Sequence, residues 1–523
     1  MANRSANQIV EDLAARFEGA EAEFHRAYWD SQIHASDEND RRRAQAEIEV
    51  RALKGDPVAY RSVLDALEEE VHDPLIKRQL ELLRASLAAN QMDDRERAEL
   101  VALGTSIESE FASFRPEVGG DLLSDNDIEE ILKTSDEEAT RRDVWLASKE
   151  IGGRVAGRIR ELVRMRNKNA RDLGYSDHYR MSLDLQELSE DWLFSVLDEL
   201  EDLTQEPFER WKGELDAKLA ARFGTDHLAP WHYADPFFQH PPPDGRIDMD
   251  PFFDGGSAPD LAQRTFTGWG LDIGPVLEAS DLWPRIAKCQ HAFCLNVDRS
   301  GDVRILANVV PGERWVEVLL HESGHAAYDL AIDPHLPWVL RRPAHTFVTE
   351  AIAILTGALP KDPRWLTDVA GVSVEDVTRV TDRLRAARAG QKILFARWGL
   401  LMSHFERDLY SDPEIDLDAR WWELVERFQS IATPSDVPKG SWASKIHIAV
   451  APVYYHNYLL GEILAAQLRG AIEDQCGSLV ANPAVGEFLR DRVFRHGQLL
   501  RWDGLVESAV GKRLSARDLV ASL

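Results

Sequence analysis

Apolar residues recur at helical spacing through most of the chain. Residues 6–30 place one apolar stripe on a charged background, formed by Ile9, Leu13, Phe17, Ala20, Phe24 and Tyr28. This spacing predicts a helix over 6–30 and similar helices over 38–95. Residues 136–175 predict another long helix, which ends at Gly174.

Two segments interrupt this helical pattern. Residues 290–297 (QHAFCLNV) and 302–309 (DVRILANV) are separated by the turn residues Asp-Arg-Ser-Gly and predict a β-hairpin. Residues 229–258 are rich in proline, glycine and aromatic residues. We expect a long ordered loop there, too aromatic to be a solvated domain linker. The predicted fold class is mainly α with a small β element.

Composition narrows the possible partners and compartment. The 523 residues carry a net charge of −29, from 61 basic and 90 acidic residues. This acidity argues against nucleic-acid partners and against an anionic membrane surface. The three cysteines, Cys289, Cys294 and Cys476, do not form a disulfide framework. No signal-peptide segment and no apolar run of about 18 residues is visible, so we expect a cytoplasmic protein.

A candidate metal motif follows the predicted hairpin, at His321-Glu322-Ser323-Gly324-His325. On a helix, residues four apart lie on one face, so His321 and His325 can bind one Zn²⁺ per chain. Glu322 then lies beside the metal as a general base. Gly324 costs about 1 kcal/mol in a helix interior, which predicts close packing at that position. The alternative is a helix with two surface histidines.

Glu350 is the candidate third ligand, 25 residues after His325. It lies in TFVTEAIAILTGAL, which predicts a second, largely apolar helix. A lone carboxylate in such a helix is unfavourable unless it is paired or metal-bound. The alternative is that Glu350 pairs with Arg341 or Arg342.

Two further polar residues lie close to this motif in the sequence. His345 is a competing third ligand, near the start of the second helix. Asp329 lies four residues after His325 and is a candidate for orienting a ligand histidine.

The last cluster is Lys445-Ile446-His447 followed by PVYYHNY, which contains Tyr455 and Tyr458. Peptide hydrolysis builds negative charge on the carbonyl oxygen, and tyrosine and histidine can donate hydrogen bonds to it. Taken alone, the segment is typical of an aromatic packing stripe.

Together these motifs resemble the angiotensin-converting-enzyme family of gluzincin peptidases, with the thimet oligopeptidase and oligoendopeptidase family as close kin. The similar stretches are RAYWDSQIHASDENDRRRA, ELVRMRNKNARDLGYSDHYRMSL, CQHAFCLNVDRSGDVRILANV with HESGH, and KIHIAVAPVYYHNYLLGEIL. The resemblance implies a two-lobed, mainly helical zincin fold with a deep substrate channel. It further implies one peptidase unit over 1–523, with lid-type helices over 1–95 and a catalytic core over 285–470.

The resemblance also implies roles for single residues. Glu322 would be the general base, and His447 and Tyr458 would stabilise the oxyanion. His291 and Ala292 would lie on the strand that pairs with the substrate backbone. The residues that would grip the C-terminal carboxylate of the substrate are Lys445 and Tyr455.

The chain departs from the family pattern at several positions. A glutamine that helps to bind the carboxylate has no counterpart around PDLAQRTFTGWG, Asn457 stands where the family has an arginine, and Ile354 stands where it has an aspartate. The expected function is a zinc metallopeptidase that acts on oligopeptides as a peptidyl-dipeptidase. The alternatives are an oligoendopeptidase, a zinc amidase for small molecules, and an inactive scaffold protein.

Overall fold

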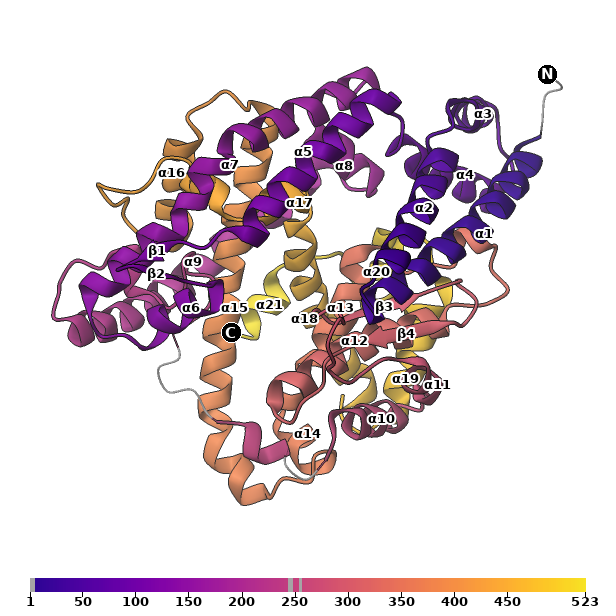
Figure 1. Ribbon diagram of the computed structural model, residues 1–523. Coiled ribbons are helices and arrows are strands. Elements are labelled where there is room, and N and C mark those ends of the chain that lie inside the picture. Colours follow the sequence, from indigo (N-terminus) through magenta and orange to yellow (C-terminus); the bar gives the residue numbers. More distant parts are fainter. Residues whose placement is uncertain (1–4, 243–247, 254–255) are drawn as a thin grey trace. The chain divides into compact units, whose positions relative to one another are not determined.

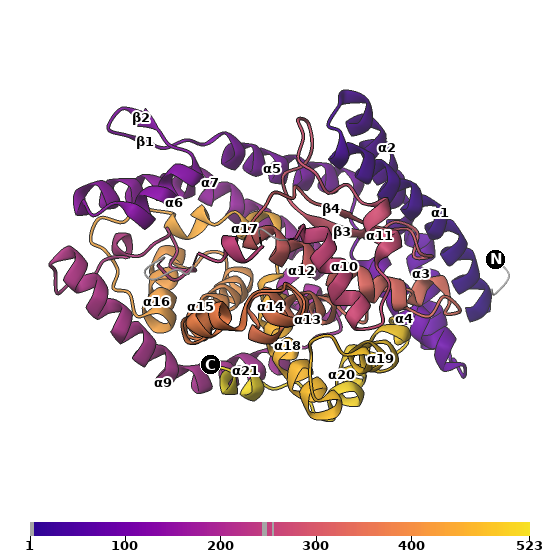
Figure 2. The same cartoon turned by 90° about the horizontal axis from the view of Figure 1, so that it is seen from below.

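The computed structural model describes residues 5–242, 248–253 and 256–523, and its helices dominate Figures 1 and 2. The prediction of a mainly α fold is confirmed. The chain forms two compact units. Unit 1 comprises Met1–Gln91, Ile247–Leu384 and Leu460–Leu519. Unit 2 comprises Met92–Arg246, Arg385–Leu459 and Val520–Leu523.

Unit 1 begins with four helices, α1 (Ala6–Ile33), α2 (Asp37–Lys54), α3 (Pro57–Glu68) and α4 (Pro74–Ala88). Side-chain caps start each of them, as in the capping box of Ser5 and Gln8 at α1. Their apolar faces share one buried cluster, which includes Leu13, Phe17, Val63, Leu80 and Leu87. The helices predicted over 6–30 and 38–95 are therefore confirmed.

A buried ion network ties α1 to the rest of unit 1. One Glu21 oxygen lies 2.8 Å from Lys54 Nζ, and the other lies 2.8 Å from Arg342 Nη2 and also pairs with Arg299. Burial alone raises the pKa of the Glu21 carboxyl, but the charges of Arg342, Arg299 and Lys54 outweigh it and lower the pKa to about 2. Glu21 is therefore ionised at every ordinary pH.

The remaining helices and strands of unit 1 include a small hairpin, which contacts α11 and α12. They are α10 (Ala258–Gly268), α11 (Gly274–Ala279), β3 (Phe293–Asn296), β4 (Val303–Leu306), α12 (Glu313–Ala331), α13 (Thr346–Gly357), α14 (Pro363–Asp368), α19 (Pro483–Arg492) and α20 (Trp502–Val510). Strands β3 and β4 are antiparallel, with Phe293 opposite Leu306 and Asn296 opposite Val303. The predicted hairpin is confirmed, with strands shorter than the apolar runs.

Unit 2 is built around long helices. Its elements are α5 (Asp94–Ser113), β1 (Glu117–Val118), β2 (Asp121–Leu122), α6 (Asp125–Thr134), α7 (Glu138–Asp172), α8 (His178–Leu185), α9 (Glu190–Phe223), α16 (Leu417–Gln429) and α17 (His447–Val450). Helix α7 confirms the helix predicted over 136–175, and Gly174 follows it with φ +90°. Three helices have residues in both units: α15 (Val374–Ser411), α18 (Tyr455–Cys476) and α21 (Arg517–Ala521).

The segment predicted as a loop over 229–258 contains two short 3₁₀ turns, Pro230–His232 and Asp250–Phe253. Its residues 243–247 and 254–255 lie outside the described part of the chain. Trp231, Tyr233 and Phe238 are buried, which agrees with an ordered loop. The segment passes from unit 2 into unit 1 with these aromatic side chains buried rather than solvated.

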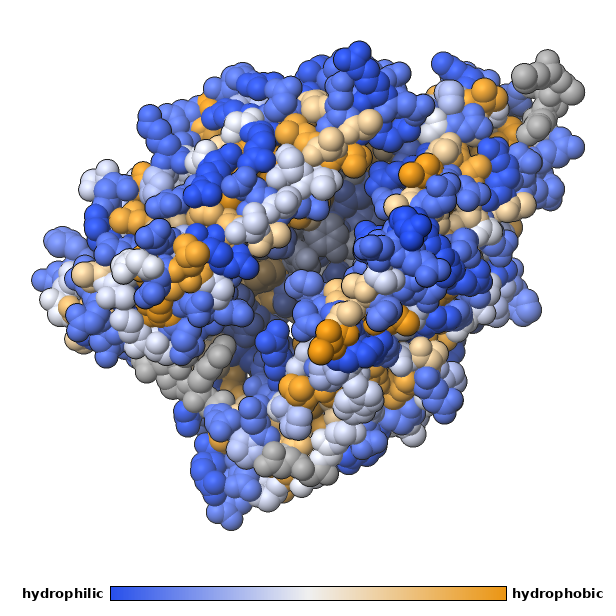
Figure 3. Space-filling view, viewed as in Figure 1, coloured by the Kyte–Doolittle hydropathy of each residue, from blue (hydrophilic) through white to orange (hydrophobic). Residues whose placement is uncertain are grey.

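The surface hydropathy, the helices and the state of the cysteines agree with what the composition predicts. On the face in Figure 3, hydrophobic residues are interspersed among hydrophilic ones. None of the helices in the described ranges is both long enough and apolar enough to cross a membrane. Cys289, Cys294 and Cys476 are free thiols, as expected from their number and spacing.

Candidate metal centre

Helices α12 and α13 pack unusually closely, and glycines make this possible. A Cβ added at Gly324 of α12 would lie 2.4 Å from Thr356 Oγ1 and 3.0 Å from Ala353 Cα of α13. Thr356 Oγ1 also donates a 2.8 Å hydrogen bond to the carbonyl of Leu320 in α12. The close packing predicted from Gly324 is confirmed, and it fixes the two helices that carry the candidate ligands.

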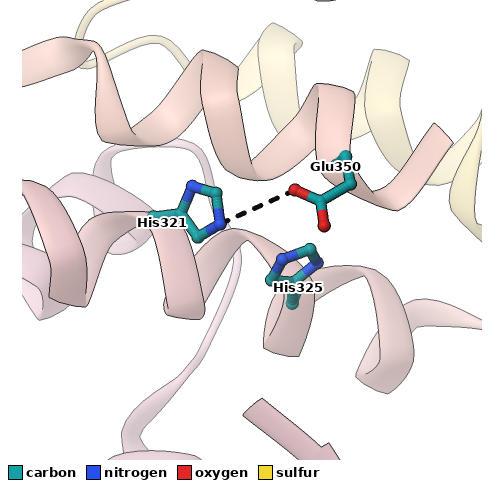
Figure 4. Close-up of side chains that lie close together, drawn as sticks. All are labelled: His321, His325 and Glu350. Carbon is teal, nitrogen blue, oxygen red and sulfur yellow. Dashed lines mark ion pairs between the residues drawn. The ribbon is translucent and has the colours of Figure 1, made fainter. Parts of the chain in front are cut away.

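The three predicted ligands meet at this helix pair. One donor atom from each of His321, His325 and Glu350 lies within 4.8 Å of the others. His321 Nε2 is 3.8 Å from Glu350 Oε2, and the rings of His321 and His325 are 5.0 Å apart. Figure 4 shows the two histidines on one helix and Glu350 pointing toward them from the other.

Each histidine ring is also held by a group that sequence reasoning missed. His325 Nδ1 lies 2.7 Å from Thr349 Oγ1, and the ring of His321 hydrogen-bonds to the main-chain carbonyl of Ala353. Such outer contacts fix the orientation of a ligand ring. Burial lowers the pKa of His321 to about 4 and that of His325 to about 3, so both rings are neutral at pH 7.

Glu322 is buried beside these ligands and is held by the hairpin. Its carboxylate accepts a hydrogen bond from the main-chain N–H of Cys294 in β3. Burial and the charge of Glu350 raise the pKa of Glu322 to about 7, although the bond from Cys294 acts in the opposite direction. A carboxyl with this pKa can both accept and release a proton near neutral pH.

The structure separates the alternatives that the sequence left open. His345 is the N-cap of α13, where its Nδ1 accepts a hydrogen bond from Phe347 N–H at 3.2 Å. It is absent from the ligand groups found among the described residues. Asp329 hydrogen-bonds to Asn296. The group that contacts the His325 ring is Thr349, not Asp329.

The predicted arginine partners of Glu350 are engaged with other groups. Arg342 pairs with Glu21, and Arg341 donates to the carbonyl of Leu336 at 2.7 Å. A packing contact instead supports Glu350: a Cβ on Gly461 of α18 would lie 3.1 Å from Glu350 Cβ.

The predicted substrate residues of unit 2 form a second cluster. Lys445 Nζ donates a 2.9 Å hydrogen bond to Gln239 Oε1 and lies over the rings of Phe237 and Trp398. Trp398 Nε1 in turn donates to Tyr455 Oη at 2.9 Å. Burial lowers the pKa of Lys445 to about 8, although the charge of Asp235 raises it. The ammonium is thus poorly hydrated and largely charged at pH 7.

His447 and Tyr458 both contact Tyr455 in this cluster. The ring centroids of Tyr455 lie 5.5 Å from those of His447 and of Tyr458. His447 Nδ1 is buried without a hydrogen-bond partner among the described residues. Burial, with the charge of Lys445, lowers the pKa of His447 to about 4, so the ring is neutral.

A strained turn precedes these tyrosines. Val453 has φ +53°, a conformation that is rare for a β-branched residue. Its N–H donates a 2.8 Å hydrogen bond to Glu406 Oε1, and Glu406 is almost completely buried. Burial raises the pKa of Glu406 to about 8.

His291 and Ala292 lie immediately before β3 rather than within it. His291 is exposed and Ala292 is partly exposed. Within the described residues, β3 pairs only with β4, so one edge of the strand has no strand partner.

A family model described as angiotensin-converting enzyme matches residues 1–209 and 284–519 of the chain. The two matched ranges cover most of the sequence and include every predicted metal and catalytic residue. The chain belongs to the angiotensin-converting enzyme family. A search of curated proteins gives no match. Family membership makes the protein a metallopeptidase, and zinc is the metal expected for it.

In this member of the angiotensin-converting enzyme family, the candidate ligand atoms suit zinc. Two neutral imidazoles and one carboxylate form a ligand set found in catalytic zinc sites, which leave a further position open. Both rings are already held by outer hydrogen bonds from α13. The side chains of His321 and Glu350 keep 33% and 14% of their surface exposed, so an ion and a water can reach them.

Proposed function

We propose that the protein is a zinc peptidyl-dipeptidase that removes dipeptides from the C-termini of oligopeptides. The observation that carries the peptidase reaction is the convergence of His321, His325 and Glu350 beside the buried base Glu322. Zinc bound there would polarise the scissile carbonyl and lower the pKa of a water molecule.

Glu322 performs the proton transfers in this proposal. It takes a proton from the attacking water and passes it to the leaving amine. The hydrogen bond from the N–H of Cys294 supports this role because it helps to hold the carboxylate in place. Zn²⁺ nearby favours the ionised form of Glu322, which is the form that acts as a base.

His447 and Tyr458 donate hydrogen bonds to the carbonyl oxygen as it gains negative charge. Both groups are suited to this because a neutral imidazole and a phenol each carry one hydrogen to donate. The contact of both rings with Tyr455 supports the assignment, since it restricts their orientation. Donors held in advance stabilise the transition state without reorganising during the reaction.

Lys445 and Tyr455 bind the free C-terminal carboxylate of the peptide, and Gln239 joins them. The charge-assisted hydrogen bonds of such a carboxylate each contribute roughly 1.5–3 kcal/mol. Support comes from the aromatic rings around Lys445, which exclude water from the ammonium. Gln239 supplies an amide that the sequence did not indicate, and its 2.9 Å contact with Lys445 supports its inclusion in this group.

The remaining parts of the proposal concern substrate access. His291 and Ala292 would pair with the extended peptide beside the open edge of β3. Residues 1–95 would form the lid and 285–470 the catalytic core of one peptidase unit. The rings of Tyr28 and Trp29 in α1 lie 5.5 and 6.2 Å from that of Phe293 in β3, which supports a place for α1 beside the substrate strand.

The test is to digest unstructured peptides of about five to fifteen residues with free and amidated C-termini, and to identify the products by mass spectrometry. We expect successive loss of C-terminal dipeptides and a large fall in kcat/KM on amidation. Lys445→Ala should cause a similar fall that amidation does not deepen. Lys439→Ala, a change at an exposed lysine nearby, should behave like wild type.

A pH profile sharpens this test. Since Lys445 binds the carboxylate only when protonated, the ratio of kcat/KM for free over amidated peptides should fall as pH rises through about 8. Cleavage at internal bonds, at the same rate with free and amidated C-termini, would instead identify an oligoendopeptidase. Lys445 would then have no role in binding the substrate.

A further inference from the structure

A short turn in unit 2 separates the two proposed oxyanion donors. Residues 451–454 connect α17, which begins at His447, to α18, which carries Tyr458 in its first turn. The path of the main chain through this turn determines where α18 begins. Val453 in the turn has φ +53°, which is unfavourable for a β-branched residue. Such a conformation persists only where the surrounding groups hold it in place.

Side chains from two other helices hold the main chain of Val453. Its N–H donates a 2.8 Å hydrogen bond to Glu406 Oε1 of α15, and its carbonyl accepts a 3.4 Å bond from Gln186 Nε2 at the end of α8. Gln186 Oε1 also accepts a 3.0 Å hydrogen bond from Asn457 Nδ2, in the first turn of α18. These contacts therefore fix the turn and the start of α18 together.

The α17 side of the turn has its own anchor. Arg166 Nη2 of α7 donates a 2.8 Å hydrogen bond to the carbonyl of Ala449. Arg166 Nη1 donates to Tyr410 Oη at 3.0 Å, which holds the guanidinium against α15. The turn is thus held at both ends, and Glu406 holds the end that leads into α18.

A ring contact carries the position of the turn to the proposed oxyanion donor. Tyr454 directly follows Val453, and its ring centroid lies 5.1 Å from that of Tyr458. A shift of Val453 would therefore move both the ring that Tyr458 packs against and the helix turn that carries it. A displacement of about 1 Å in a reacting group can cost ~10²-fold in rate.

We propose that Glu406 is a positioning residue for Tyr458, because it holds Val453 in the left-handed conformation and so fixes the first turn of α18. The inference rests on the proposed function, in which Tyr458 donates a hydrogen bond to the carbonyl oxygen. Glu406 itself touches no substrate and acts only through the main chain of the turn.

The form of the Glu406 carboxyl at pH 7 decides which variant preserves this role. Burial raises its pKa to about 8, while the hydrogen bond from Val453 and the charge of Arg166 act in the opposite direction. The carboxyl is therefore largely protonated and neutral at pH 7. Glutamine is neutral as well, and its carbonyl oxygen can accept the same hydrogen bond from Val453.

The experiment measures kcat of the zinc-loaded variants with a fluorogenic peptide at pH 7, and their stability by urea unfolding. Glu406→Leu removes the acceptor at similar volume, and we expect kcat to fall by ~10²-fold. Glu406→Gln should retain most of the wild-type kcat. Asp408→Leu is the matched control, because it removes a carboxylate that pairs with Arg420 at 2.7 Å on the same helix. It should lower stability without lowering kcat.

A double variant separates positioning from a general loss of stability. If Glu406 acts through Tyr458, Glu406→Leu should lower kcat far less in a Tyr458→Phe background, because the hydroxyl that it positions is absent. Effects of residues that act as a unit do not multiply, whereas independent effects do. If Glu406→Leu does not fold, Gln186→Ala replaces it in the same comparison, since Gln186 is partly exposed and holds the same turn.

Three results would overturn the inference. They are wild-type kcat in Glu406→Leu, equal losses in Glu406→Leu and Glu406→Gln, and losses that multiply fully in the double variant. Wild-type kcat in Tyr458→Phe alone is a distinct result. It would refute the oxyanion role in the proposed function, and the positioning role of Glu406 with it.

Discussion

Replacing Gly324 with alanine tests whether close packing of α12 against α13 holds the metal ligands in place. The new Cβ would lie 2.4 Å from Thr356 Oγ1, and 3.0 and 3.2 Å from the Cα and N of Ala353. The hydroxyl can rotate, but the backbone of Ala353 can yield only if the two helices separate. Gly324 lies between His321 and His325, so this separation would move both histidines away from Glu350.

The magnitude follows from two opposing effects. Alanine gains about 1 kcal/mol over glycine in a helix interior, and overpacking a close contact costs about 1–3 kcal/mol. Gly470 in α18 belongs to the same unit, and an added Cβ there meets nothing within 4 Å. Since Gly470→Ala carries only the helical gain, we expect Gly324→Ala to be less stable than this control by about 1–3 kcal/mol.

The assay is urea unfolding of the metal-free proteins, together with zinc competition against a chromophoric chelator. Metal–ligand distances tolerate shifts of only about 0.2 Å, so we expect Gly324→Ala to lose zinc affinity by ~10–100-fold. Gly470→Ala should keep the wild-type affinity. If Gly324→Ala matched Gly470→Ala in both stability and zinc affinity, close packing would not position the ligands.

Three other predictions follow from single side chains. Glu322→Gln should retain zinc and the fold while kcat falls by at least ~10²-fold, measured with a fluorogenic peptide. Tyr458→Phe should lower kcat by ~10²–10³-fold with little change in KM, whereas an effect on stability alone would make it a packing residue. Glu21→Gln should destabilise unit 1 by about 3–5 kcal/mol at pH 7. The pKa of Glu21 is lower in the folded protein than in the unfolded chain, so its ion pairs stabilise the fold only while the carboxylate is ionised. In chemical denaturation, the difference in unfolding free energy between wild type and Glu21→Gln should therefore shrink as pH falls from 4.5 toward about 2.

Local sequence spacing was sufficient to predict the helices and to select the three candidate ligands that come together at α12 and α13. Two histidines four apart share a helix face, and an isolated glutamate in an apolar helix needs a partner, so His321, His325 and Glu350 could be selected without a structure. Gly324 could likewise be linked to close packing, because glycine is unfavourable in a helix interior.

The contacts that orient these ligands could not be predicted, because they depend on tertiary packing. Thr349 is one of several polar residues in α13, and only the packing of α13 against α12 places it beside His325. The N–H of Cys294 reaches Glu322 by a main-chain contact that leaves no signature in residue types. Asp329 had suitable spacing, yet it bonds to Asn296 instead.

The contact between Gln239 and Lys445 could not be predicted either, because the two residues are far apart in the sequence. Gln239 lies 206 positions before Lys445, in the loop rich in proline and aromatic residues. The position of this loop relative to Lys445 follows only from the folded structure of unit 2.

Zinc-dependent recovery of peptide hydrolysis is the measurement that tests the central claim most directly. Metal-free wild-type protein should be inactive on an unstructured peptide, and one equivalent of Zn²⁺ should restore full activity. Glu350→Ala should stay folded and remain inactive under the same conditions, because only His321 and His325 would be left as ligands. Hydrolysis by the metal-free protein, or full recovery by Glu350→Ala, would contradict a zinc centre built on these three residues.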